Sequence, residues 1–158
     1  MLPERIGGRY RVVRELGQGG MGVVYLAQDE ASEGAEVALK VLLTRRFSES
    51  GLRHFEQEFR TLTSLSHPNL TEVYDFGRVT PEGTDHPVPF FTMEFVPGET
   101  LGRHLEPGGD RFDALYECLA QTGQALAYLH GRGVIHQDVK PSNILVTEVD
   151  GTPQPKII

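Results

Sequence analysis

Hydrophobic residues in the first part of this chain are spaced mainly as in strands. Alternating or β-branched runs predict five strands, at residues 10–16, 23–27, 37–43, 70–76 and 90–95. Between the third and fourth of these, apolar residues recur every three or four positions, which predicts a helix over residues 50–64. His67-Pro68-Asn69 ends that helix, and three prolines and a glycine make residues 80–89 a loop.

The pattern becomes helical in the second part of the chain. Pro97-Gly98 is typical of a hinge, and a helix is predicted over residues 113–130. Its expected apolar face carries Leu115, Leu119, Leu126 and Leu129. A short strand at 144–147, a turn at Asp150-Gly151 and a strand starting at Lys156 complete the prediction. The fold class expected is α+β, with a small β-rich lobe joined to the beginning of a helical lobe.

Composition narrows the possible functions. The chain has 158 residues, 39% of them hydrophobic and 23% charged, with a net charge of −7. No basic run exceeds Arg45-Arg46, which argues against nucleic acid or an anionic membrane as the main partner. No signal peptide and no membrane span of ~20 apolar residues is visible, so a cytoplasmic location is expected. The single cysteine, Cys118, is expected to be a small buried hydrophobe.

The segment from His136 to Asn143 combines three kinds of polar side chain at short offsets. Pro141 rules out a continuing helix, so the segment is predicted to be a short loop on which these side chains converge. Asp138 could accept a hydroxyl proton, Lys140 could neutralise a phosphate, and the oxygen of Asn143 could hold magnesium.

A glycine-rich turn precedes the second strand, with Gly17, Gly19 and Gly22 in a Gly-x-Gly-x-x-Gly pattern and Gly20 between them. Glycines let backbone amides approach phosphate oxygens, although this motif alone also suits a turn with no ligand. A dinucleotide-binding fold would need a helix after the last glycine, whereas a strand follows here. The Gly-Lys-Ser/Thr ending of a Walker loop is also absent.

Lys40 lies in an apolar strand and shares a face with Ala38, which predicts that it points inward. A buried lysine needs a partner, and Glu58 on the apolar face of the first helix is the expected one. The alternatives are a lysine that reaches solvent at the strand edge and a glutamate that only borders the helix face.

These motifs, in this order, resemble those of protein kinases, and residues 16–27 are similar to the glycine-rich loops of bacterial serine/threonine kinases. The resemblance covers about residues 10–158 and implies ATP and Mg²⁺ as cofactors and a protein Ser/Thr hydroxyl as substrate. It also implies a bilobal fold. Residues 1–9 are the lead-in, and residues 10–96 form an N-lobe of antiparallel sheet plus one helix. Residues 97–158 form the hinge and only the start of the helical C-lobe.

The same resemblance implies a role for each site residue. Asp138 accepts or orients the substrate hydroxyl, Lys140 steadies the transferred phosphate, and Asn143 ligates magnesium. Lys40, paired with Glu58, holds the nucleotide phosphates. His136 belongs to a buried stack with Leu62 and Val73. Among the implied nucleotide-binding residues, Val24, Ala38 and Leu145 enclose the adenine. Met93 is the gatekeeper, and Glu94 and Val96 contact the adenine edge by their backbone. The full implied set is Leu16, Gly17, Gly19, Gly20, Gly22, Val24, Ala38, Lys40, Met93, Glu94, Val96, Asn143 and Leu145.

The sequence departs from the family pattern at two places. Gln137 stands where the family usually has an arginine that holds a phosphorylated activation loop, and a neutral glutamine cannot pair with phosphate as a guanidinium does. The chain stops at Ile158, where the family's Asp-Phe-Gly motif would follow, so we expect no meaningful kinase activity from these 158 residues alone. The alternatives are a nucleotide-binding pseudokinase acting as a scaffold and, less favoured by the Lys-Pro-Ser-Asn run, a small-molecule kinase of similar fold.

Overall fold

The computed structural model describes residues 4–20, 22–42, 49–80, 86–105 and 112–158. They divide into two compact units. The first unit comprises the chain up to Ser64 together with Glu72–Phe95, and the second comprises Leu65–Thr71 and Val96–Ile158.

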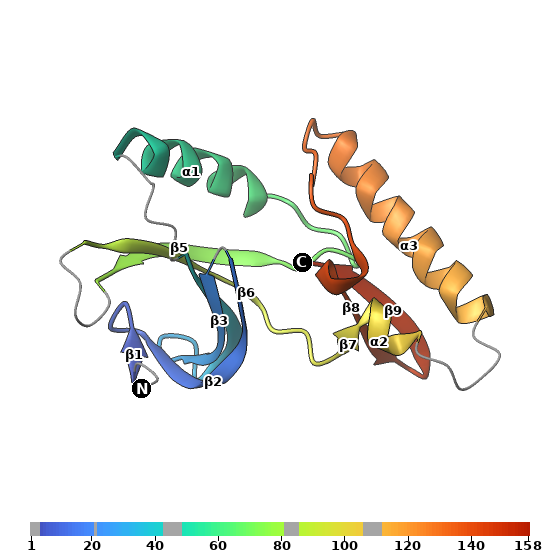
Figure 1. The fold of residues 1–158 in the computed structure, drawn as a ribbon, viewed down its shortest axis with the longest axis horizontal. Helices are drawn as coiled ribbons and strands as arrows, with labels where there is room; N and C mark the ends of the chain where they lie inside the picture. The colour runs from blue at the N-terminus through green and yellow to red at the C-terminus, as the bar shows by residue number, and fades with distance from the viewer. Residues whose placement is uncertain (1–3, 21, 43–48, 81–85, 106–111) are drawn as a thin grey trace. The chain divides into compact units, whose positions relative to one another are not determined.

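The first unit is a six-stranded antiparallel sheet with one helix, shown in Figure 1. The strand order is β1-β2-β3-β4-β6-β5. The strands are β1 (Arg5–Ile6), β2 (Tyr10–Gly19), β3 (Gly22–Asp29), β4 (Ala35–Leu42), β5 (Val73–Val79) and β6 (Val88–Glu94). Helix α1 (Glu49–Leu62) comes between β4 and β5 in the chain.

The register of the central strands gives the sheet two different faces. Residues that pair across antiparallel strands share a face, so Val37, Leu39 and Val41 of β4 lie on the face opposite Ala38 and Lys40. On the first of these faces lies the core of the unit: Ile6, Tyr10, Ala27, Val37, Leu39, Val41 and Phe90. The other face carries Lys40, with Phe91 as its cross-strand neighbour.

Helix α1 packs against the face of the sheet that carries Lys40. Phe59 is 5% exposed, and its ring centroid lies 5.5 Å from that of Phe76 and 5.9 Å from that of Phe91. Because Phe91 pairs with Lys40, these ring contacts anchor α1 beside the lysine by burying apolar surface.

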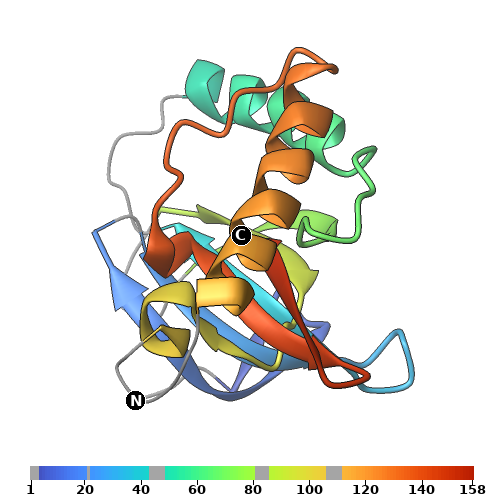
Figure 2. The ribbon, with the colours of Figure 1, turned by 90° about the vertical axis from the view of Figure 1, so that its right-hand side faces the viewer.

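The second unit packs a helix against a small sheet. It contains β7 (Glu99–Thr100), α2 (Leu101–His104), α3 (Phe112–His130), the 3₁₀ helix η1 (Pro141–Asn143), β8 (Ile144–Val149) and β9 (Thr152–Ile157). Its sheet has the order β7-β8-β9, and Figure 2 shows α3 crossing the β8–β9 hairpin. The core is formed by Leu70, Leu101, Cys118, Ala125, Leu129, Ile144, Val146 and Ile157.

Most of the elements predicted from the sequence are confirmed, with informative differences at their ends. The fourth predicted strand begins at Val73, because Leu70 instead forms a parallel bridge with Ile157 in the second unit. Strand β9 begins at Thr152, four residues before the predicted start. The prediction missed its first part because Pro153 and Pro155 are unusual in strands. Prolines are tolerated there since β9 lies at the edge of its sheet. The short elements β1, β7 and α2 were not predicted. Leu43 of the third predicted strand and residues 81–85 of the predicted loop lie outside the described residues.

The predicted leucine face of α3 was partly wrong. Leu129 is buried, but Leu119 is 49% exposed, and the buried face runs through Cys118, Thr122 and Ala125. Cys118 is fully buried in the core of the second unit, which confirms it as a packed hydrophobe, and this burial raises the pKa of its thiol. Among the described residues, no helix is long and apolar enough to cross a membrane.

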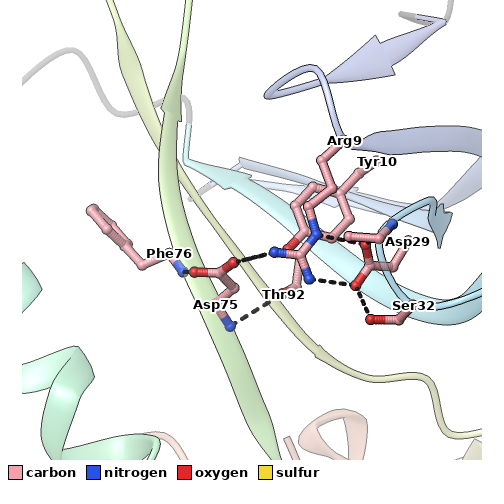
Figure 3. A network of polar contacts seen from close by, with 8 residues as sticks. Arg9, Tyr10, Asp29, Ser32, Asp75, Phe76 and Thr92 are labelled. Atoms are coloured by element: carbon pink, nitrogen blue, oxygen red, sulfur yellow. Dashed lines mark hydrogen bonds and ion pairs between the residues drawn. The ribbon is translucent and has the colours of Figure 1, made fainter.

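Arg9 ties the start of β2 to two other parts of the first unit (Figure 3). Its Nε and Nη2 donate to the two carboxylate oxygens of Asp29, each at 2.6 Å, and its Nη1 donates to Oδ2 of Asp75 at 2.8 Å. Tyr10 also donates its hydroxyl to Asp75, at 3.2 Å. The guanidinium thereby links the β3–β4 turn to β5.

Asp29 is the most enclosed acid of this network, with its side chain 7% exposed. The Arg9 guanidinium is the main cause that lowers its pKa from 3.8 to about 2, helped by hydrogen bonds from Ser32 and the Ala31 amide. The ionised form is therefore the one that stabilises the fold.

Gly22 cannot be replaced without displacing backbone. Its φ is +151°, and a Cβ at this position would lie 1.9 Å from the carbonyl oxygen of Val41 on β4. Gly20, two residues earlier in the same hairpin, has no atom within 4 Å of the corresponding position.

We predict that Gly22→Ala lowers the free energy of unfolding by about 2 kcal/mol or more, because both the backbone conformation and the contact with β4 must change. Gly20→Ala is the matched control and is expected to change it by less than about 1 kcal/mol. Urea denaturation of the two variants measures the difference; equal stability would contradict the assigned geometry of Gly22.

We predict that Asp29→Asn lowers the free energy of unfolding at pH 7 by about 1–2 kcal/mol. Because the folded-state pKa of Asp29 is depressed, its contribution is present above the unfolded value of 3.8 and is lost as the pH falls through about 2. The deficit of the variant measured by denaturation should therefore shrink below pH 4. Glu30→Gln, at the more exposed Arg5–Glu30 pair, is the control and should cost less at pH 7.

Candidate active site

The glycine-rich segment forms the end of the β2–β3 hairpin. Gly17 pairs with Val24 and Gly19 with Gly22, so a strand follows the last glycine as predicted. Gly17, Gly19 and Gly20 have open space where a Cβ would stand, whereas Gly22 is constrained by β4. Backbone on the open side of the hairpin could therefore approach a phosphate closely. Leu16 lies partly exposed in β2 before this turn.

The residues predicted to contact the adenine and phosphates within the first unit share one face of its sheet. Val24 pairs with Lys40, and Ala38 pairs with Met93, which places all four side chains on the same face. Ala38 is 6% exposed and Lys40 is half-buried. The inward position predicted for Lys40 agrees with this burial.

The predicted ion pair between Lys40 and Glu58 stays a prediction. Glu58 belongs to α1, which is anchored over the Lys40 face by Phe59, but the Glu58 side chain lies outside the described residues.

The remaining predicted nucleotide contacts lie at the end of the first unit and in the second. Glu94 ends β6, and its N–H already donates to the carbonyl of Glu72 at 2.8 Å. Val96 is buried in the second unit, and Leu145 lies half-buried in β8.

In the second unit, Asp138, Lys140 and Asn143 come together as the sequence predicts. Lys140 Nζ donates to both carboxylate oxygens of Asp138, at 3.0 and 2.8 Å. Asn143 Nδ2 donates to the Asp138 carboxylate and to its backbone carbonyl, both at 2.8 Å. The three side chains form a hydrogen-bonded cluster centred on the Asp138 carboxylate. The cluster is accessible to solvent, with about half of the Asp138 side chain exposed (51%).

The hydrogen bond from Lys140 is the main cause that holds the pKa of Asp138 below its usual value, and the hydrogen bond from Asn143 adds to it. Asp138 is therefore ionised at neutral pH and able to accept a proton or a hydrogen bond from a hydroxyl.

The backbone of this segment is more regular than the predicted loop. Pro141 begins the one-turn helix η1, because a proline at the first helical position loses no hydrogen bond. The Asn143 N–H donates to the Lys140 carbonyl at 2.9 Å, which closes that turn. Gln137 has a φ of +64°, the left-handed region, immediately before Asp138. The turn sets the spacing at which Lys140 and Asn143 both reach Asp138.

The segment is also held from outside by the last residue of the chain, which sequence reasoning missed. The Ile158 N–H donates to the carbonyl of Asn143 at 3.0 Å, and Nε2 of His136 lies 3.1 Å from the Ile158 carbonyl. The first contact joins two backbone groups and the second joins the His136 ring to a backbone carbonyl, so the residue type of Ile158 carries no signal that could have identified it as the partner. His136 is half-buried; its predicted stack with Leu62 and Val73 stays a prediction.

Asn143 suits one position in a magnesium site. Mg²⁺ prefers oxygen ligands and is commonly held by one or two protein groups together with substrate phosphates and water. The described residues contain no group of three His, Cys, Asp or Glu side chains that could hold a metal without such help. The donor set therefore fits a metal that arrives with a nucleotide.

Two cavities lie elsewhere in the first unit. One of about 270 Å³ is lined by Glu56, Phe59, Arg60, Thr63, Asp75 and Phe76. Another of about 360 Å³ is lined partly by Arg9, Asp29 and Tyr74. Neither lining includes Lys40 or a glycine of the hairpin, so neither is the predicted nucleotide site.

Comparison with known proteins assigns a family to this arrangement. Residues 10–158 match the family described as protein kinase domain. The chain is 39% identical over 142 residues to serine/threonine-protein kinase pkn2 of Myxococcus xanthus, covering 89% of this chain and 16% of the relative. It is 35% identical over 152 residues to serine/threonine-protein kinase PrkC of Bacillus subtilis, covering 92% and 22%.

A third relative and a solved structure agree. Serine/threonine-protein kinase PknA of Mycobacterium tuberculosis is 39% identical over 145 residues, covering 90% of this chain and 33% of the relative. The crystal structure of the Mycobacterium tuberculosis PknI kinase domain is 29% identical, with a TM-score of 0.75, and the match covers 99% of this chain and 62% of that chain. The chain thus spans a third or less of these curated relatives.

We predict that Lys140→Met raises the pKa of Asp138 toward 3.8, because the largest cause of its depression is removed. Asn143→Ala is expected to raise it less. Lys140→Arg keeps the charge and serves as the control, with the pKa remaining depressed. Carbon-detected NMR titration of the Asp138 carboxyl measures all three; an unchanged pKa in Lys140→Met would contradict the assignment.

Proposed function

This chain belongs to the protein kinase family, and we propose that it forms the ATP-binding lobe and catalytic loop of a serine/threonine protein kinase. The observation that carries the proposal is the hydrogen-bonded cluster of Asp138, Lys140 and Asn143, in which an ionised carboxylate lies beside a cation and an amide. That set suits the transfer of the ATP γ-phosphate to a hydroxyl, which depends on positioning and charge neutralisation.

Nucleotide binding is assigned to both units. In the first, the open glycines 17, 19 and 20 approach the phosphates, with Leu16 and Gly22 shaping the turn. Val24, Ala38 and Leu145 contact the adenine, and Met93 borders it. The backbones of Glu94 and Val96 bind its edge. Lys40, paired with Glu58, binds the phosphates.

Each residue of the catalytic loop has a distinct task in the transfer. The Asp138 carboxylate orients the substrate hydroxyl and takes its proton as the new P–O bond forms and the bond from the γ-phosphorus to the β–γ bridging oxygen breaks, which releases ADP. Lys140, which already lies within hydrogen-bond distance of Asp138, neutralises charge on the transferred phosphoryl group. Asn143 holds Mg²⁺, which, when bound, offsets the charge of the phosphates.

The domain boundaries, the substrate and the cellular location of the chain are part of the same proposal. Residues 1–9 form a lead-in, 10–96 the N-lobe, and 97–158 the hinge with the first part of the C-lobe. The substrate is a Ser or Thr hydroxyl of a protein in the cytoplasm, and a nucleic-acid partner is not proposed. The presence of Lys40, Glu58, Asp138 and Asn143 together favours an active kinase over a pseudokinase scaffold.

We predict that Asp138→Asn lowers kcat for phosphotransfer in the natural full-length polypeptide by about 10²–10⁴-fold, because the proton acceptor is lost. Lys40→Met should also abolish most activity. Asp150→Asn is the matched control, since asparagine tolerates the left-handed conformation of that β8–β9 turn, and its activity should be unchanged. Transfer of labelled γ-phosphate to a protein substrate is the measurement.

The 158 residues alone are expected to show no magnesium-dependent turnover in the same assay. Full activity in Asp138→Asn, or robust turnover by the 158 residues, would contradict the respective assignment.

A further inference from the structure

Asn69 is a buried polar residue that the assignments above leave without a role. It is 4% exposed and belongs to the second unit, although it follows α1 closely in the chain. Its Nδ2 donates to the carbonyl of Pro155 on β9 and to Oε1 of Gln121 on α3, both at 2.8 Å. Gln121 donates in turn from Nε2 to the carbonyl of Pro153, at 3.3 Å.

The side-chain amides of Asn69 and Gln121 hydrogen-bond to the edge of β9 that faces away from β8. Among the described residues, no other strand pairs with this edge over the first half of β9. Pro153 and Pro155 have no N–H, and their carbonyls face away from β8, where Gln121 and Asn69 meet them. Farther along, Ile157 donates its N–H to the Asn69 carbonyl at 3.0 Å and accepts from the Thr71 N–H at 2.9 Å. Asn69 makes two of these four bonds on the outer edge of β9, one with its side chain and one with its backbone carbonyl, and Gln121 and Thr71 make the other two.

The end of β9 leads directly to the catalytic loop. Ile158 is joined to the loop by its N–H to the Asn143 carbonyl and by its carbonyl to the His136 ring. Asn143 in turn holds the Asp138 carboxylate at 2.8 Å. A continuous series of short contacts therefore runs from Asn69 through β9 and Ile158 to Asp138.

We propose that Asn69 and Gln121 are positioning residues for the Asp138 and Asn143 groups, acting through β9. The inference rests on the proposed kinase function for its catalytic consequence, but the structural coupling stands independently of it. Because the loop is otherwise exposed, with no core of its own, its geometry depends on β9, which Ile158 directly follows.

The variants that test this are Asn69→Ala and Gln121→Ala. The first removes the donor to Pro155 and to Gln121, and the second removes the donor to Pro153 at a less buried position, so it keeps the test available if the first fails to fold. Thr122→Val is the matched control: it is one residue from Gln121, buried, and its hydroxyl bonds only within α3, to the Cys118 carbonyl.

The first measurement is amide hydrogen exchange on the natural polypeptide. Exchange at the Ile158 and Asn143 amides should become about tenfold faster in Asn69→Ala and measurably faster in Gln121→Ala, and stay unchanged in Thr122→Val. Unchanged exchange in both test variants would overturn the proposal, as would equal acceleration in the control.

The second measurement is phosphotransfer kinetics in the same polypeptide. In Asn69→Ala, kcat should fall about tenfold while KM for ATP changes less than about twofold, because the loop groups act on the transferred phosphoryl. A fall in kcat equal to that of Thr122→Val would overturn the positioning role. If the wild type transfers no phosphate, the kinase proposal fails, and the exchange data alone decide the coupling.

Discussion

The antiparallel register of β4 between β3 and β6 is the constraint on which the first unit depends. It places Leu39, fully buried, on the core side and Lys40, half-buried, on the other, one residue apart. A slip of one residue would exchange the two faces, burying the lysine in the core and exposing the apolar side chains. The same register aligns Val24, Ala38 and Met93 with the lysine, so stability and the proposed nucleotide site have a common origin.

Two features pin this register from its ends. Gly22 lets β3 begin against the backbone of β4, where any side chain would collide with the Val41 carbonyl. At the opposite end, Arg9 joins Asp29, the last residue of β3, to Asp75 on β5. The guanidinium has partners on both carboxylates, so the network contributes geometry as well as charge.

In the second unit, the structure must hold an exposed polar loop in place. Its three polar side chains hold one another, and the turn of η1 sets their spacing, but neither supplies apolar burial. That burial comes from α3 against β9, through Cys118, Ala125 and Ile157. Ile158 follows Ile157 of this core and contacts the loop through its bonds with Asn143 and His136.

The short-range features of this protein could be predicted from its sequence. Asp138, Lys140 and Asn143 meet because offsets of two and five residues in one turn leave few other arrangements, and the strands around Lys40 follow from alternation. Long-range partners could not be predicted. The burial of Thr122 and Ala125 in place of Leu119, the pairing of Leu70 with Ile157, and the bonds of Asn69 depend on which distant surfaces meet. The sequence by itself determined the local chemistry and the alternating faces, since these arise from neighbouring residues. Only the tertiary structure decided which backbone carbonyls the buried amides satisfy, because every residue has the same backbone groups and only their position in the fold selects a partner.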